Sequence, residues 1–182
     1  SYAIWDMSRK IRASAALTEA FDAGVDGLVG RLAASGSGDG AEFLSEFVAF
    51  LAEFGSRGPN EWELSAQTWE TDPTIALAAI ERVRFQTDGQ GPRERAGILA
   101  TERESLVGKV RQKLADLGDD TLSGMCEGAL VGGNMMVFRE RGKTNVIKAV
   151  HEARVTFREL GQRHGNTGML ADASHIFMLT AD

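Results

Sequence analysis

Apolar residues recur along most of the chain at spacings of three and four, the period of a helix that buries one face. The clearest stripe lies in residues 41–54 and is aromatic. Its main members are Phe43, Phe47, Phe50, Leu51 and Phe54. We expect this stripe to be core rather than a ligand site. With only three prolines in 182 residues, the pattern predicts an all-α fold, an irregular bundle of about six helices with a short extended C-terminal tail.

Turn-forming residues divide the pattern into segments. The predicted helices cover residues 3–34, 41–54, 73–86, 92–117 and 120–141, and the last runs from 143 or 145 to 163. Asp72 followed by Pro73 is typical of a helix start, and the Asp119-Asp120-Thr121 run offers another cap. Gly55 is expected to end the second helix. Residues 175–179 are too short for a helix and are expected to form a strand or an extended end piece.

Composition narrows the classes of function. A single cysteine excludes a disulfide framework and a cysteine-rich zinc site. No apolar run approaches the roughly 20 residues of a membrane span, and no signal peptide is evident. We therefore expect a cytoplasmic location and no membrane partner. A net charge of −6 without a basic block argues against nucleic acid as a partner. We expect residues 1–182 to be a single helical domain, a fragment of a larger multidomain protein.

The charges are unevenly distributed. Residues 1–80 hold 5 basic and 12 acidic residues, whereas residues 81–182 hold 15 and 14. The densest basic set lies on the last two predicted helices. Its members are Arg139, Arg141, Lys143, Lys148, Arg154, Arg158 and Arg163. This set is either a solvated helix face or a docking face for an acidic domain or a phosphate-bearing ligand.

Catalytic signatures are missing from the sequence. It has no glycine-rich phosphate loop, no nucleophile elbow and no histidine pair four residues apart. Cys126 has no base near it in sequence, so we expect a buried, inert thiol. His164 fits the C-terminal end of a helix without any function, and the apolar run after His175 is unlike a phosphocarrier loop. We therefore expect no catalytic residue and no metal site in this segment.

The loop between the second and third predicted helices is the most informative stretch. It brings arginine, carboxylates and tryptophans together between two apolar helices. Arginine binds carboxylates in a bidentate manner, so Arg57 could pair with Glu61 or Glu63 and hold the loop in place. Alternatively, Arg57 or Trp69 faces a ligand.

Two motifs in order resemble a known family. Residues 53–61, with Trp69 and the Asp72-Pro73 pair, resemble the Gly-His/Met-Arg-Gly-Pro-Gly-Glu … Trp … Asp-Pro motif of the phosphoenolpyruvate-utilising dikinases, especially the rifampin phosphotransferase branch related to phosphoenolpyruvate synthase. The C-terminal part resembles the ending of that branch. The matching positions there are Arg139, Lys143, Arg154, 157–161, Gly168, Leu170 and 175–180. The resemblance covers residues 41–182. The sequence departs from the family at Ser56, where His or Met is common, at Asn60, where Gly is common, and at His175, where an acidic residue is usual.

The resemblance implies a function for the parent protein. In this family an ATP-grasp domain comes first, a helical central domain second and a phosphohistidine domain last, and the β-phosphate of ATP passes through that histidine to an acceptor. The resemblance places this chain in the central domain, which binds the acceptor in the rifampin branch. It implies no cofactor in this segment and ATP with Mg²⁺ in the parent enzyme. The implied partners are the ATP-grasp and phosphohistidine domains of the same parent chain and an apolar small-molecule acceptor.

Five residues follow as candidate substrate-binding residues. Arg57, Glu61 and Trp69 come from the motif. Met135 and Met136 lie beside a row of glycines, at positions 124, 128 and 132, on one predicted helix. Methionine packs adaptably around apolar ligands, so this helix lines an acceptor pocket or, alternatively, packs closely on another helix. A helical scaffold or protein-interaction domain without a small-molecule site is the alternative function. A self-contained enzyme would need a catalytic constellation that the sequence lacks.

Overall fold

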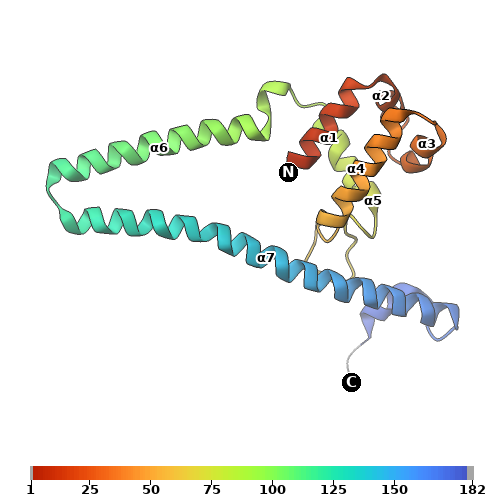
Figure 1. Cartoon of the computed structure of the whole chain (residues 1–182). Coiled ribbons are helices and arrows are strands. Elements are labelled where there is room, and N and C mark those ends of the chain that lie inside the picture. The colour runs from red at the N-terminus through yellow and green to blue at the C-terminus, as the bar shows by residue number, and fades with distance from the viewer. Residues whose placement is uncertain (1, 180–182) are drawn as a thin grey trace. The chain divides into compact units, whose positions relative to one another are not determined.

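The computed structural model describes residues 2–179, apart from the side chains of Gln90, Asn134 and Val137. This part of the chain is all-α, as predicted, with no strand (Figure 1). It contains seven α-helices and two 3-10 helices. These are α1 (Tyr2–Ala13), α2 (Ala15–Asp22), α3 (Leu28–Ala34), α4 (Gly38–Phe54), α5 (Pro73–Arg84), η1 (Asp88–Gln90), α6 (Pro92–Leu117), α7 (Asp120–Asn166) and η2 (Ala173–Met178). The predicted all-α class is therefore confirmed, with more helices than the six expected.

The chain divides into two units. Of the described residues, the hairpin unit consists of residues 86–143 together with Tyr2, and the bundle unit consists of residues 3–85 and 144–179. Helix α7 contributes its first half to the hairpin unit and its second half to the bundle unit. No helix in residues 2–179 is both long and apolar enough to cross a membrane.

The first predicted helix, residues 3–34, is wrong in its extent, because the structure breaks it twice. Ser14 is extended at φ −115° and ψ 122°, and its hydroxyl accepts the Leu17 amide, so it caps a new helix. Gly24 and Gly27 then take left-handed conformations at φ 93° and 67°. Glycine adopts these angles without a steric penalty, and the two glycines therefore separate α2 from α3.

The aromatic stripe on α4 forms the centre of the core in the bundle unit, as predicted. Phe43, Phe47 and Phe50 are at most 5% exposed, and Phe54 packs against them. Phe21 from α2 meets Phe43 edge to face, with the ring centroids 5.4 Å apart. Buried aliphatic residues of α1, α3 and α5 complete the same cluster. Removing this apolar area from water is the main force that holds the five helices together.

Local capping signals correctly predict the start of α5. The Asp72 carboxylate accepts the Thr74 amide at 3.1 Å, and Pro73 occupies the first turn. Gly55 ends α4 as expected, although its φ of −58° is right-handed. A Cβ on Gly55 would lie 2.8 Å from Glu70 Cβ and still closer to the Leu51 carbonyl oxygen. Close approach of the chain, rather than a left-handed conformation, therefore requires glycine here.

Two predictions for the C-terminal part are wrong. The expected break between residues 141 and 143 does not exist, because α7 is one helix of 47 residues. Gly142 alone costs a helix only about 1 kcal/mol, and no proline interrupts the segment. Residues 173–178, expected in part as strand or extended tail, form the 3-10 helix η2 with Ile176 buried. Thr180, the last position of the C-terminal motif, lies outside the described residues.

Candidate functional site

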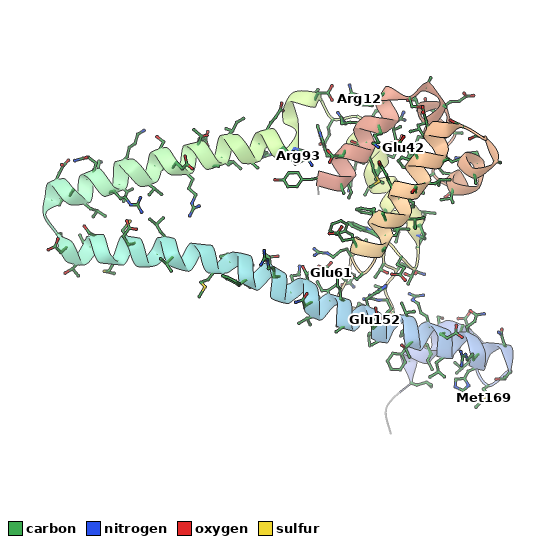
Figure 2. All side chains as sticks on the ribbon, viewed as in Figure 1. Arg12, Glu42, Glu61, Arg93, Glu152 and Met169 are labelled. Atoms are coloured by element: carbon green, nitrogen blue, oxygen red, sulfur yellow. The ribbon has the colours of Figure 1, made fainter. Side chains whose placement is uncertain are left out.

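The loop that carries the first motif lies between α4 and α5 and contacts the second half of α7. Figure 2 shows Glu61 of the loop close to Glu152 of α7. The contact is made by Arg154, which is fully buried. One guanidinium nitrogen of Arg154 donates to the carbonyl oxygens of Glu61 at 2.8 Å and Glu63 at 2.9 Å. This side chain therefore fixes the backbone of a loop more than 90 positions earlier in the chain.

A second arginine acts one helical turn later. Arg158 donates to the carbonyl oxygens of Ser65 at 2.7 Å and Ala66 at 3.2 Å. Its guanidinium also lies over the ring of Phe177, 5.6 Å from the centroid, so it connects the loop to η2. Burial lowers the pKa of Arg154, and the charge of Arg158 lowers it further. These two arginines, with α7 behind them, form the arginine clamp of the loop.

A buried histidine completes the contact. His151 is 4% exposed, and its Nε2 lies 3.0 Å from the Glu70 carboxylate. Its Nδ1 lies 3.2 Å from a guanidinium nitrogen of Arg154 and 3.4 Å from the Thr68 hydroxyl. A guanidinium only donates hydrogen bonds, so Nδ1 must accept. The proton of the neutral imidazole therefore sits on Nε2 and is donated to Glu70.

Three predicted site residues lie within the clamped loop. Arg57 Nε pairs with Glu61 Oε2 at 2.7 Å, the first of the two pairings considered from the sequence. Glu63 instead accepts the Ser65 amide and hydroxyl, which lowers the pKa of the Glu63 carboxyl. Trp69 is partly buried, stacks on Phe50 with ring centroids 5.3 Å apart, and donates its amide to the Arg57 carbonyl. Contacts within the chain thus already engage Arg57, Glu61 and Trp69.

Two further positions of the motif have steric explanations. A Cβ on Gly58 would lie 2.9 Å from the carbonyl oxygen of Gln67, so the loop closes too tightly for a larger residue. Ser56 is 6% exposed, and its hydroxyl has no hydrogen-bond partner in the described part of the chain. The Gly-Ser-Arg-Gly sequence therefore shapes the turn on which Arg57 sits.

The other predicted site residues lie in the hairpin unit. Met135 and Met136 are 60% and 50% exposed on α7. The glycine row at 124, 128 and 132 has no atom within 4 Å of where a Cβ would be. Close helix packing against this row is therefore not found within residues 2–179, and the acceptor-pocket interpretation remains a prediction. Cys126, expected to be buried, is only half-buried.

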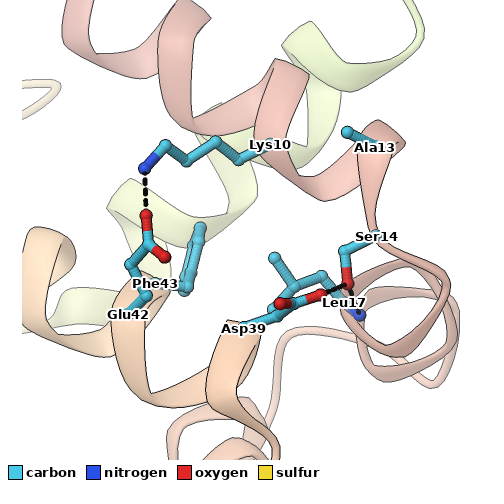
Figure 3. A pocket seen from close by; sticks show the side chains of 7 residues that line it. All are labelled: Lys10, Ala13, Ser14, Leu17, Asp39, Glu42 and Phe43. Atoms are coloured by element: carbon cyan, nitrogen blue, oxygen red, sulfur yellow. Dashed lines mark hydrogen bonds and ion pairs between the residues drawn. The ribbon is translucent and has the colours of Figure 1, made fainter.

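A small pocket of mixed polar and apolar lining lies in the bundle unit, among α1, α2 and α4 (Figure 3). It has a volume of about 260 Å³, with Phe43 and Leu17 as its apolar wall. Lys10 donates to Glu42 at 2.7 Å and also pairs with Glu46, and these carboxylates raise the pKa of Lys10. The sequence does not reveal this pocket, because its residues come from three helices, α1, α2 and α4, and form no motif. Asp39, the other charged residue of the lining, accepts the Ser14 hydroxyl.

A broader hollow lies at the start of α6 in the hairpin unit. It has a volume of about 710 Å³, and its wall is largely apolar. Its lining residues are Gly89, Glu94, Gly97, Ile98, Thr101 and Glu102. No group of three or more metal-ligating side chains occurs anywhere in residues 2–179.

Sequence reasoning missed the role of the arginine clamp. Arg154 and Arg158 belong to the basic set expected to be solvated or to dock a partner. Both instead bind loop carbonyls of the same chain. Their spacing of four residues indicates a shared helix face, but the sequence does not reveal what that face contacts.

The geometry defines a helical domain built around a clamped loop. A family model described as the rifampicin phosphotransferase fourth domain matches residues 1–126. This is more than half of the chain, and the chain therefore belongs to that family. Comparison with curated proteins and with solved structures gives no match. The matched range contains the loop, both hollows and all of α6, whereas His151 and the arginine clamp lie beyond it.

Proposed function

We propose that the chain is the acceptor-presenting helical domain of a larger ATP-dependent phosphotransferase. In this proposal the parent protein carries an ATP-grasp domain, where ATP and Mg²⁺ bind, and a phosphohistidine domain that moves the phosphoryl group. The segment described here binds neither ATP nor metal and supplies no catalytic residue. Membership of the rifampicin phosphotransferase fourth-domain family supports this role.

One observation carries the proposal. Helix α6 has 26 residues, none of them buried, although it is apolar at several positions of one stripe. Leu99, Leu106, Val110 and Leu117 form this stripe, within a sector of roughly 40° at 3.6 residues per turn, whereas Ile98 lies about 100° to one side of it. All five are between 45% and 71% exposed. A contiguous exposed apolar surface of this kind marks a binding site more often than it marks bare surface. All of α6 lies inside the range that the family model matches.

The α6 hollow indicates the chemistry of the acceptor. Ile98 supplies an apolar contact, and Thr101 supplies a hydroxyl that donates within the helix to the Gly97 carbonyl. Glu94 and Glu102 place two carboxylates at the edge. Such a wall suits a large apolar molecule with hydroxyl or amide donors at its rim. We assign the acceptor to this class, with rifampicin as the compound to test and Met136 as a further contact.

The clamped loop has a supporting role in this proposal. Arg57, Glu61 and Trp69 are engaged with each other and with the core. The part of the loop that stays open to a ligand of the bundle unit is the Arg57 side chain, which is 34% accessible.

Titration of the chain with rifampicin tests the proposal. Ligand at 100 times its dissociation constant adds about 2.7 kcal/mol to the free energy of unfolding, which raises the Tm by several degrees. We expect this shift with rifampicin and none with ATP. Ile98→Glu should abolish the shift, whereas Val48→Glu, at an exposed position of α4, should leave it intact. Equal shifts in both variants would overturn the α6 assignment, and no shift in the wild-type chain would overturn acceptor binding.

A scaffold without a small-molecule site is the second candidate function. The favouring observation is that contacts within the chain satisfy both the predicted loop site and much of the basic set. In that case the chain would hold neighbouring domains in place, and neither rifampicin nor any other apolar acceptor would shift its Tm.

A further inference from the structure

The first half of α7 presents an apolar face that nothing in the hairpin unit covers. Five positions lie within a sector of roughly 80° at 3.6 residues per turn. They are Gly124, Gly128, Val131, Met135 and Phe138. The three larger side chains of this α7 face are 60–65% exposed. The two glycines have no atom within 4 Å of where a Cβ would lie, so another chain can approach the helix closely at these points.

The two ends of the α7 face carry opposite charges. Asp119 and Asp120 lie at its N-terminal end, and no lysine or arginine occurs between Lys113 and Arg139. Glu127, farther along, is already paired with Arg111 of α6 at 2.6 Å. The other end follows with three basic residues and one acidic residue. These are Arg139, Glu140, Arg141 and Lys143. A helix with an acidic start and a basic end complements a second copy of itself that runs in the opposite direction, whereas a parallel copy would place like charges together.

We propose that the α7 face is a self-association surface, on which two copies of the chain pair with their α7 helices antiparallel. The two-fold axis lies between Val131 and Gly132. This register places Met135 of one copy over Gly128 of the other. The glycine supplies the hole and the methionine fills it, as in ridge-into-groove packing.

The same register aligns the charges. It sets Asp120 against the Lys143 position of the other copy, and Gly124 against Arg139. The contact is isologous, since each pairing, such as Met135 over Gly128, occurs once on either side of the two-fold axis, and it therefore closes as a dimer. The proposal goes beyond acceptor binding: it assigns Met135 to the dimer contact and leaves Met136, on the neighbouring side of the helix, to the acceptor.

Sedimentation of the chain tests this surface. The concentrations, from about 1 to 200 µM, are on the order of the dissociation constants expected for weak dimers. We expect a monomer–dimer equilibrium whose dissociation constant rises at least tenfold in Met135→Glu. Val48→Glu, a matched control of similar exposure on α4, should leave the constant unchanged. A chain that stays monomeric throughout, or equal weakening by both variants, would overturn the proposal.

Charge reversal tests the direction of the pair. The variant Asp120→Lys and the variant Lys143→Glu should each dimerise more weakly alone, because each places like charges opposite one another in this register. Mixed together they should restore the dimer, because the lysine at position 120 of one copy then meets the glutamate at position 143 of the other. Restored dimerisation supports the antiparallel pair, and its failure in two variants that keep their helical circular dichroism would overturn it.

Disulfide trapping tests the register. In a Cys126→Ser background, Val131→Cys places two thiols beside the axis, and mild oxidation should give a covalent dimer. The native Cys126 is a built-in control. It lies five residues from the axis, so two copies would be separated by about 15 Å at 1.5 Å per residue, and it should not cross-link. Cross-linking through Cys126 as fast as through position 131 would overturn the register.

Discussion

Arg154 and His151 are both buried and lie one helical turn apart, with a guanidinium nitrogen 3.2 Å from the imidazole Nδ1. Since the guanidinium can only donate, this contact selects the tautomer of His151 that donates from Nε2 to Glu70. The same arginine fixes two loop carbonyls. One residue therefore sets both the backbone of the loop and the hydrogen-bond direction of the histidine beside it.

The first prediction concerns the tautomer. A proton-detected nitrogen correlation spectrum should show His151 as the Nε2–H form at neutral pH. In Arg154→Met the donor to Nδ1 is lost, so the Nδ1–H form should gain population by donating to the Thr68 hydroxyl, which lies 3.4 Å away. An unchanged tautomer in that variant would show that Arg154 does not control the ring. His164, half-buried elsewhere on α7, serves as the internal reference.

The second prediction concerns stability. Arg154→Ala leaves the carbonyls of Glu61 and Glu63 without their buried donor. A hydrogen bond to a charged group contributes about 1.5–3 kcal/mol to the free energy of unfolding. We expect urea unfolding to show a loss of about 3 kcal/mol for the bundle unit. Arg163→Ala removes only an exposed pair with Glu159, in which the arginine is 74% accessible. It should cost under about 0.5 kcal/mol. Equal losses of unfolding free energy in the two variants would contradict the role of Arg154 in holding the loop.

The third prediction concerns pH. The Asp172 carboxylate accepts the hydroxyl and the amide of Ser174 at the start of η2, and these hydrogen bonds lower its pKa. A group whose pKa is lower in the folded state stabilises that state above its unfolded value, about 3.9 for aspartate, and loses this effect as the pH falls through the folded value. The Ser174 amide resonance should therefore shift on acidification below about pH 4.

Asp172→Asn is the matched variant for this titration. The asparagine amide keeps an acceptor oxygen but does not titrate in this range. The Ser174 resonance should then stay unchanged across the same pH interval. A shift of equal size in the variant would assign the pH effect to another group.

Local sequence signals predict where helices begin and end better than they predict which residues contact one another in the fold. Asp72 with Pro73 gives the start of α5, because capping depends on residues two positions apart. The bounds of α6, residues 92–117, follow from a proline at one end and from Gly118, which is left-handed at φ 63°, at the other. The break at Ser14 is not predictable in this way. Serine ends one helix and starts the next only where its hydroxyl accepts a backbone amide of the following turn.

The candidate site was predictable only in part. The Arg57–Glu61 pair lies within one turn of chain, so its spacing reveals it. The burial of Arg154 depends instead on two carbonyls of a loop about 90 residues away, and backbone carbonyls leave no trace in a sequence. In the sequence, an arginine that binds loop carbonyls occupies the same helical spacing as an arginine on a solvated helix face. The aromatic stripe of α4 was predictable, because burial of phenylalanine needs no specific partner.

The fourth prediction separates two kinds of glycine. A Cβ on Gly55 would collide with the Leu51 carbonyl oxygen and lie 2.8 Å from Glu70 Cβ. Glu70 also holds His151, so the collision would push the loop away from α7. Gly55→Ala should therefore destabilise the bundle unit by about 2 kcal/mol or more, within the range for overpacked sites. Gly108→Ala, on α6 with open space around it, should instead stabilise its helix by up to about 1 kcal/mol. Chemical unfolding followed by circular dichroism measures both, and a gain in stability in Gly55→Ala would show that the loop does not need this close approach.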